Sequence, residues 1–294
     1  MSKWTLGILG GSGLYDIAGL EAAREEVIET PWGATSDPLM RGRLGGVELV
    51  FLPRHGRGHR LTPTTVPYRA NIDALKRAGC TDILSFSACG SLKEAYAPGD
   101  FVAVDQFIDR TFAREKSFFG PGMVAHVSMA HPVCERLSGL GADALEAVGA
   151  HVHRGGTYLS MEGPQFSTLA ESQLYRQWGC DVIGMTNMPE AKLAREAELP
   201  YATLAMVTDY DCWHEEEEAV SVTNVLEIMG RNAEHAKKAV IALCERLSGV
   251  ARTPGPQGIE TCLDHALITA PEKRDPALLE KLDAVAGRVL HGKG

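Results

Sequence analysis

The chain has 294 residues, of which 45% are hydrophobic and 23% charged, and its formal net charge is −9 at pH 7. These values are close to those of ordinary globular proteins, and they exclude a disordered, collagen-like or coiled-coil chain. The net negative charge argues against binding of nucleic acid or of an anionic membrane, because both require a broad basic face. A local basic pocket for a small anion is still compatible with this charge.

Targeting and membrane segments are not expected. The apolar stretch near the N-terminus is interrupted at Gly7 and Gly10, too early for the core of a signal peptide. No apolar run approaches the roughly 18 to 20 residues that span a bilayer. The seven cysteines form an odd, widely scattered set, which favours reduced thiols over structural disulfides. We therefore expect a cytoplasmic protein.

Short aliphatic and β-branched runs predict strands that are buried on both faces. Stretches with helical spacing lie between them, and this alternation implies an α/β domain with helices on both faces of the sheet. The predicted strands are Thr5–Leu9, Val47–Leu52, Ile83–Ser87, Phe101–Phe107, Thr157–Met161, Asp181–Met185 and Tyr201–Val207. The predicted helices are Thr65–Ala78, Pro132–Val148, Thr168–Trp178 and Glu190–Ala197.

The C-terminal part has a different pattern. A long amphipathic helix is predicted over Val220–Ser248, followed by a Pro- and Gly-rich breaker that begins at Arg252. The segment Asp275–Leu290 again spaces its leucines and valines for one apolar helix face. This last helix packs on its own domain or reaches a neighbouring subunit.

Two motifs suggest an anion site. The glycine-rich segment Gly7–Asp16 follows a strand without matching a dinucleotide or phosphate-loop pattern, so Ser12 and the backbone amides either face an anion or form a tight turn. The basic cluster Pro53–Arg60, which includes Arg54 and His55, also follows a strand. Ligands favour this edge of a sheet and guanidinium groups match phosphate oxygens, although a solvated basic loop is the alternative.

Three further strand ends carry small, polar or soft side chains. Ser87, the Ala88 amide and Gly90 allow a close approach of backbone to a ligand, or tight packing only. Phe166 can stack on a planar ring and Ser167 can make a polar contact, or Ser167 caps the helix that follows. In the segment Gly184–Glu190, Met185 offers an apolar surface and Thr186 a hydroxyl. Cys89 is best interpreted as a buried, inert thiol.

Asp209 and Asp211 end the predicted strand Tyr201–Val207 and are two residues apart, so on an extended backbone both point to the same side. Such carboxylates can protonate a leaving group or accept hydrogen bonds from an amine. Metal binding together with Cys212 and His214 is the competing interpretation, but no zinc or calcium ligand pattern is matched.

Taken in order, these motifs resemble the methylthioadenosine phosphorylases of the trimeric class of purine nucleoside phosphorylases. The resemblance implies a single-domain three-layer αβα sandwich with a central mixed twisted sheet. Residues 1–250 would form the catalytic domain and residues 251–294 a C-terminal extension. The motifs are Gly7–Leu14, Arg54–Arg60, Tyr68–Leu75, Ser87–Leu92, Glu162–Ser172, Met185–Glu190 and Asp209–Trp213.

The implied activity is phosphorolysis of S-methyl-5'-thioadenosine to adenine and 5-methylthio-D-ribose 1-phosphate, a pentosyltransferase reaction of methionine and purine salvage. Inorganic phosphate is then a co-substrate, and no cofactor or metal is expected. The resemblance further implies a homo-oligomer, a trimer or a hexamer, with small-molecule ligands and without nucleic acid or membrane partners.

The same resemblance assigns roles to residues. Asp209, Asp211 and Ser167 would be catalytic, with both aspartates contacting the base. Phe166 and Ser167 would flank the purine, Met185 would pack on the ribose, Val222 and Val225 would face the methylthio group, and His126 would come from an adjacent subunit. The phosphate would be held by Ser12, Arg54, His55, Ser87, Ala88 and Thr186.

Alternatives remain open at this stage. One is a purine nucleoside phosphorylase of broader or 6-oxopurine specificity, including methylthioinosine. The aspartate pair argues against it, because a carboxylate accepts from the adenine amine and repels a 6-oxo group. Hydrolysis would leave Arg54 and His55 unexplained, and a non-enzymatic nucleoside-binding module would bind without phosphate-dependent turnover.

Overall fold

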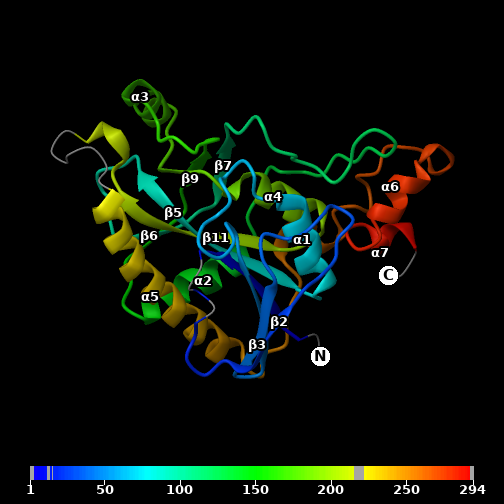
Figure 1. Ribbon diagram of the computed structural model, residues 1–294, viewed down its shortest axis with the longest axis horizontal. Helices are drawn as coiled ribbons and strands as arrows, with labels where there is room; N and C mark the ends of the chain where they lie inside the picture. The colour runs from blue at the N-terminus through cyan, green and yellow to red at the C-terminus, as the bar shows by residue number, and fades with distance from the viewer. Residues whose placement is uncertain (1–2, 12–13, 15, 215–221, 292–294) are drawn as a thin grey trace.

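The computed structural model describes residues 3–11, 14, 16–214 and 222–291, and for residues 222–226 the backbone alone. An 11-stranded mixed sheet runs through this part of the chain (Figure 1). Its centre is formed by four mutually parallel strands, β4 (Val47–Pro53), β1 (Thr5–Gly10), β5 (Asp82–Ser91) and β11 (Tyr201–Asp209). The carboxyl ends of these strands therefore lie at one edge of the sheet.

Shorter strands extend the sheet on both sides. The antiparallel pair β2–β3 continues it beyond β4, while β10, β9 and β7 continue it beyond β5, and β6 and β8 follow β11. Their bounds are β2 (Glu21–Glu26), β3 (Leu39–Leu44), β6 (Phe101–Ala103), β7 (Gln106–Asp109), β8 (Val152–Arg154), β9 (Thr157–Ser160) and β10 (Val182–Gly184).

Helices cover both faces of the sheet, as predicted. Helices α2 (Glu135–Ala147) and α5 (Val222–Leu247) pack on one face. Helices α1 (Tyr68–Arg77) and α4 (Asn187–Glu196) pack on the other, together with the C-terminal segment that contains α6 (Pro276–Lys281) and α7 (Gly287–Leu290). Helix α3 (Leu169–Gln177) projects at one end of the molecule (Figure 1). The sheet and its two helical layers form a single-domain three-layer α/β sandwich.

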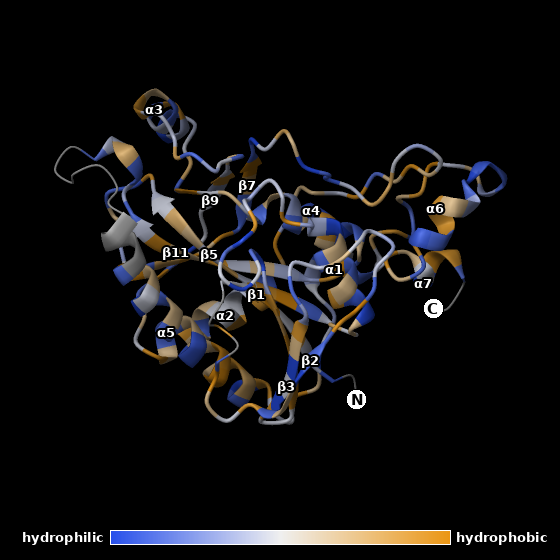
Figure 2. Cartoon of the chain, in the orientation of Figure 1, coloured by the Kyte–Doolittle hydropathy of each residue, from blue (hydrophilic) through white to orange (hydrophobic). Residues whose placement is uncertain are grey.

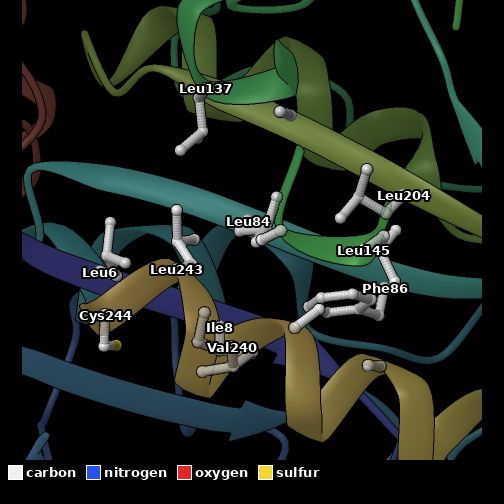
Figure 3. Packing of buried hydrophobic residues seen from close by; sticks show 14 of the residues in the cluster. Leu6, Ile8, Leu84, Phe86, Leu137, Leu145, Leu204, Val240, Leu243 and Cys244 are labelled. Atoms are coloured by element: carbon white, nitrogen blue, oxygen red, sulfur yellow. The ribbon is translucent and has the colours of Figure 1, made fainter. Parts of the chain in front are cut away.

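Buried apolar side chains hold the sheet and the helices α2 and α5 together. Hydrophobic and hydrophilic residues mix along α5 (Figure 2), because one side of this helix faces the sheet and the other side faces solvent. Each fully buried aliphatic side chain contributes about 1.5 to 3 kcal/mol relative to exposure. Figure 3 shows side chains of this buried cluster: Leu6 and Ile8 of β1, Leu84 and Phe86 of β5, Leu204 of β11, Leu137 and Leu145 of α2, and Val240, Leu243 and Cys244 of α5.

The structure differs from the sequence predictions at the edges. The predicted strand Phe101–Phe107 is two strands, because β6 pairs with β11 and β8 whereas β7 pairs with β9. Strands β2, β3 and β8 were not predicted, and β2 is largely exposed and rich in glutamate. The predicted helix Asp275–Leu290 is divided into α6 and α7, since Leu282, Val285 and Ala286 between them all turn into the core.

All seven cysteines are free thiols, as the scattered spacing indicated. Within the described ranges, no helix combines the length and the apolar composition needed to cross a bilayer.

Glu196, at the end of α4, is a buried carboxyl group that fastens the loop 110–131 to this helix. It accepts hydrogen bonds from the Phe118 amide and the Ser117 hydroxyl, both at 2.7 Å. Burial raises the pKa of Glu196 to about 7 in spite of these bonds. A carboxyl whose pKa is raised on folding stabilises the protein below its unfolded pKa, and this stabilisation is lost as the pH rises through about 7.

The substitution Glu196→Gln removes this pH dependence and keeps an oxygen acceptor for the Phe118 amide. Relative to the native chain, the variant should gain roughly 2 kcal/mol in free energy of unfolding between pH 5 and pH 8. Urea unfolding of both proteins at the two pH values measures this gain. Glu245→Gln, at an exposed position of α5, serves as the control and should show no such gain. An unchanged difference between native chain and Glu196→Gln at pH 5 and pH 8 would contradict the argument.

Candidate active site

Arg54 follows β4 and joins the ends of three central strands. Its amide donates to the Gly10 carbonyl of β1 at 2.9 Å, and its guanidinium donates to the Phe86 carbonyl and the Ser85 hydroxyl of β5 at 3.1 and 2.6 Å. The guanidinium also forms a bidentate ion pair with Glu190 of α4, and both side chains are almost fully buried. Burial lowers the pKa of Arg54, but the Glu190 carboxylate outweighs this effect and raises it overall, so Arg54 stays charged.

His55 is neutral at pH 7. Burial lowers its pKa to about 4, and the positive charge of Arg54 acts in the same direction. The ring Nδ1 lies 2.8 Å from the Leu61 carbonyl, which can only accept, so Nδ1 carries the proton and Nε2 is an acceptor. The ring of His59 stacks on His55 with centroids 4.2 Å apart.

Two other arginines of the predicted basic cluster bind the chain around their own loop and not the strand ends. Arg57 pairs with Glu25 and Asp37, and the Arg60 guanidinium donates to the Ser36 carbonyl. The cluster therefore fixes its own loop, and Arg54 is the member that reaches the strand ends.

Two predicted hydroxyl groups meet next to Arg54. The Ser87 and Thr186 oxygens are 3.1 Å apart, and the buried Tyr158 hydroxyl lies 3.4 Å from Ser87. Ser87 and the neighbouring Ala88 belong to β5, whereas Thr186 follows β10 and is only 4% exposed. Strands of opposite direction thus place two hydroxyls at one point, where they can donate to an anion.

Arg114 and Glu162 hold the segment that carries Met185, and sequence reasoning assigned no role to either. The fully buried Arg114 donates to the carbonyls of Met185 and Met188, and it pairs with Glu162 at 3.0 Å. Burial raises the pKa of Glu162, but hydrogen bonds from the Thr64 hydroxyl, two backbone amides and Arg114 lower it to about 2. Arg114 lies in a loop without a motif, so no sequence signal was available for it.

Phe166 and Ser167 lie between β9 and α3. Thr168, and not Ser167, caps α3, in a capping box with Glu171. Ser167 is therefore available for another role, and its hydroxyl lies 3.6 Å from the Met161 sulfur. Phe166 is 59% exposed, although it is a large apolar residue. The Ser167 carbonyl accepts from the Cys212 thiol, which places Ser167 beside the segment that follows β11.

The aspartate pair is brought together by a turn and not by an extended backbone. Strand β11 ends at Asp209, and Asp211 begins a 3-10 helix (Asp211–Trp213) with φ of 54°. The Asp211 amide donates to the Asp209 carboxylate at 2.8 Å, and the Thr208 hydroxyl donates to it at 2.7 Å. Burial raises the pKa of Asp211, and the charge of Asp209 adds to this effect against the opposing Ser172 hydroxyl.

Strand β5, which carries Ser87, has a glycine at position 90 because a side chain would not fit there. A Cβ at Gly90 would lie 2.9 Å from the Asp209 carboxylate and 3.2 Å from Ile183. Gly90 pairs in register with Asp209, so the carboxylate passes directly over the glycine.

Some predicted residues are not placed at this edge. Ser12 lies outside the described residues, and the side chains of Val222 and Val225, at the start of α5, are likewise not described. The His126 amide donates to Ala266 of the C-terminal segment, so the structure ties His126 to that segment. Within the described part of the chain, Asp209, Asp211, Cys212 and His214 do not gather as a set of metal ligands.

Comparisons with known proteins point to one class of enzyme. The sequence pattern of the phosphorylase superfamily matches residues 5–245. The S-methyl-5'-thioadenosine phosphorylase of Cereibacter sphaeroides is 65% identical over 290 residues, covering 99% of this chain and 100% of that protein. The structure of a methylthioadenosine phosphorylase from an Antarctic soil metagenomic library is similar with a TM-score of 0.90 and 46% identity, over 97% of this chain and 99% of the other.

A further solved structure contains a nucleoside. It is a mutant of the adenosine/methylthioadenosine phosphorylase from Schistosoma mansoni in complex with methylthioadenosine. Its TM-score with this chain is 0.77 at 39% identity, covering 85% of this chain and 93% of the other.

Removing the buried partner of Arg54 tests how far the strand ends depend on this ion pair. Glu190→Gln leaves the guanidinium buried and uncompensated, which should lower the free energy of unfolding by about 3 kcal/mol. In the matched control, Glu25→Gln removes one partner of the exposed pair with Arg57 and should cost less than about 0.5 kcal/mol. Denaturant unfolding at pH 7 measures both. Equal losses in the two variants would show that the buried pair has no special role.

Proposed function

The chain belongs to the phosphorylase superfamily, and we propose that it catalyses the phosphorolysis of S-methyl-5'-thioadenosine to adenine and 5-methylthio-D-ribose 1-phosphate. The observation that carries this proposal is the arrangement along β5. Hydroxyl donors gather at Ser87, and the Asp209 carboxylate lies over Gly90, three residues further on. Because β5 and β11 are parallel and end together, these hydroxyl donors and this carboxylate lie at the same edge of the sheet, where a phosphate and a base can be bound side by side.

Phosphate binds, in this proposal, where Ser87 and Thr186 meet. Their hydroxyls donate to it, the Ala88 amide and Ser12 complete the cradle, and Arg54, whose charge Glu190 compensates, adds its guanidinium at the end of the same strand. His55 presents its Nε2 acceptor, which accepts from the hydroxyl of monohydrogen phosphate. In this proposal no metal or other cofactor takes part, because protein hydroxyl, amide and guanidinium groups supply the hydrogen bonds to phosphate.

The proposed reaction begins with loosening of the bond between the sugar C1' and the base. The ribose then has oxocarbenium character, which the phosphate dianion stabilises electrostatically before one of its oxygens bonds to C1'. The leaving adenine takes a proton at its imidazole-ring nitrogen. Asp209 gives or shares this proton, while Asp211 donates its amide to the Asp209 carboxylate and keeps its own carboxylate as an acceptor for the adenine amine. Monohydrogen phosphate loses a proton when its oxygen bonds to C1', so protons balance over the turnover.

The remaining residues position the nucleoside. Phe166 stacks on the purine and Ser167 makes a polar contact with it, while Met185, held by Arg114, packs on the ribose. Val222 and Val225 supply an apolar surface for the methylthio group. A 5'-hydroxyl lacks hydrogen-bond partners on such a surface, so methylthioadenosine is preferred to adenosine.

Release of free adenine from S-methyl-5'-thioadenosine tests the reaction directly. The purified chain should release adenine only when inorganic phosphate is present, and it should leave inosine intact because Asp209 and Asp211 repel a 6-oxo group. Liquid chromatography measures the free base released from S-methyl-5'-thioadenosine and from inosine, each with and without phosphate.

Three other outcomes would replace the proposed activity with a different one. Adenine release without phosphate would make the chain a nucleosidase, and cleavage of inosine would make it a 6-oxopurine enzyme. Absence of any cleavage, with binding of the nucleoside retained, would reduce it to a binding module.

We further propose that the chain assembles as a homotrimer, in which residues 1–250 form the catalytic domain. Large apolar residues are exposed near the site: Phe112, which is 82% exposed, together with Leu169, Leu174 and Trp178 on and beside α3. Exposed apolar residues gathered in this way are typical of an interface between protein chains. His126, in the loop 110–131 that contacts the C-terminal segment, then completes the site of an adjacent subunit.

Sedimentation of the native chain should give a mass about three times 31.7 kDa. Phe112→Asp should shift this mass toward the monomer and raise the KM for the nucleoside, because the charge cannot be buried at the interface. Val27→Asp, which replaces an equally exposed apolar residue beside β2, is the matched control and should change neither quantity. A native chain that is monomeric and fully active at micromolar concentration would rule out the trimer.

The cysteines bear on the compartment in which the protein works. Free thiols throughout the chain support a cytoplasmic enzyme, since thiols persist in a reducing compartment. Its products, adenine and a sugar phosphate, would enter purine and methionine salvage. Its partners would be small molecules and copies of itself, and not nucleic acid or membranes.

A further inference from the structure

Asp100, His151 and His153 form a cluster at strands β6 and β8 that includes none of the residues of the proposed active site. One carboxylate oxygen of Asp100 lies 3.1 Å from His151 Nδ1, and the other lies 2.8 Å from His153 Nε2. The three ligand atoms that these side chains offer all lie within 4.8 Å of one another. The phosphorolysis mechanism uses none of the three residues.

We propose that this cluster binds a divalent transition-metal cation of the zinc type. Zinc takes imidazole nitrogen and carboxylate oxygen ligands at about 2.0 to 2.2 Å, most often in tetrahedral geometry. Tetrahedral ligand atoms at that distance are about 3.4 Å apart. The separations of His151 and His153 from Asp100, 3.1 and 2.8 Å, would each open by about half an ångström or less, and the two imidazole nitrogens, which lie within 4.8 Å, can reach the same spacing. Two imidazoles with one carboxylate favour such a metal over magnesium or calcium, which prefer oxygen ligands.

The ligands are held in place by their surroundings. The Ala97 amide donates to the Asp100 carboxylate at 3.1 Å, which orients this group toward the imidazoles. The Tyr96 ring stacks on His153 with centroids 4.0 Å apart. Outer contacts of this kind fix the orientation of metal ligands in known sites.

Access and charge also fit a bound cation. The His151 side chain is 69% exposed, whereas Asp100 and His153 are mostly buried, so an ion can enter from solvent and keep water in its remaining position. The neighbouring Arg154 is turned toward Asp143 and Glu146, and therefore does not occupy the place of a metal.

The position of the cluster gives the ion a structural role. Asp100 directly precedes β6, and both histidines belong to or adjoin β8, an edge strand that pairs only with β6 in the described part of the sheet. A metal would link these two strands. The Asp100 carbonyl also accepts from the Val207 amide of β11, so the link continues to a central strand.

Zinc titration of the full-length chain, after removal of metals with a chelator, tests the proposal. Isothermal calorimetry measures the number of zinc ions bound per chain. This number should be one higher for the native protein than for His151→Ala or His153→Gln. His131→Ala, which removes another exposed histidine, should bind zinc like the native chain. Zinc in excess should raise the melting temperature of the native chain by a few degrees and leave that of His151→Ala unchanged. Magnesium should have no effect on either.

The location of the ion can be checked independently in a zinc-soaked crystal, where anomalous scattering should give a peak between the three side chains. His151→Ala is chosen because its exposed side chain can be removed without loosening the fold, and its metal-free melting temperature and phosphorolysis rate should equal those of the native chain. Equal zinc stoichiometry in the native and His151→Ala chains would overturn the proposal, as would the absence of an anomalous peak at the cluster. Neither result would affect the proposed phosphorolysis.

Discussion

The buried ion pair between Arg54 and Glu190 is the interaction on which the site depends. It connects the end of β4 to α4, while further bonds of Arg54 reach β1 and β5. Taking two charges out of water is costly, and their attraction offsets that cost only when the geometry satisfies the remaining donors. Here the Ser85 hydroxyl and the Phe86 carbonyl provide that satisfaction. The pair therefore determines how the strand ends lie relative to one another, which is what brings Ser87 and Thr186 together.

A second buried arginine, Arg114, holds the other end of the short segment 185–190. Arg114 binds the Met185 and Met188 carbonyls, while Glu190 anchors the end of the segment to Arg54. The segment that presents Met185 and Thr186 is thus fixed from both ends. A site built this way needs little reorganisation when charge develops on the substrate, which is the main source of electrostatic catalysis.

The central fold and the strand-end location of the site could be predicted because they depend on local patterns. Non-alternating aliphatic runs predicted β1, β4, β5 and β11, and polar residues directly after them indicated the sheet edge that carries the candidate site. The edge strand β2 could not be found, since its exposed glutamates, alanines and arginine leave no apolar pattern and the strand is held by backbone pairing with β3. The partners of Arg54 and Arg114 were also beyond reach, because these contacts join residues 136 and 48 positions apart and leave no periodic signal.

The charge of the site differs from what its composition suggests. The two buried arginines are each neutralised by a glutamate, and burial keeps His55 uncharged at pH 7. An anion at Ser87 and Thr186 would therefore meet hydroxyl donors and a compensated guanidinium, not a strong positive field. A strongly cationic pocket would hold both phosphate and a sugar phosphate tightly, whereas a neutralised one lets either dissociate. For an enzyme that consumes one phosphate compound and releases another at every turnover, a compensated site is the arrangement that permits repeated catalysis.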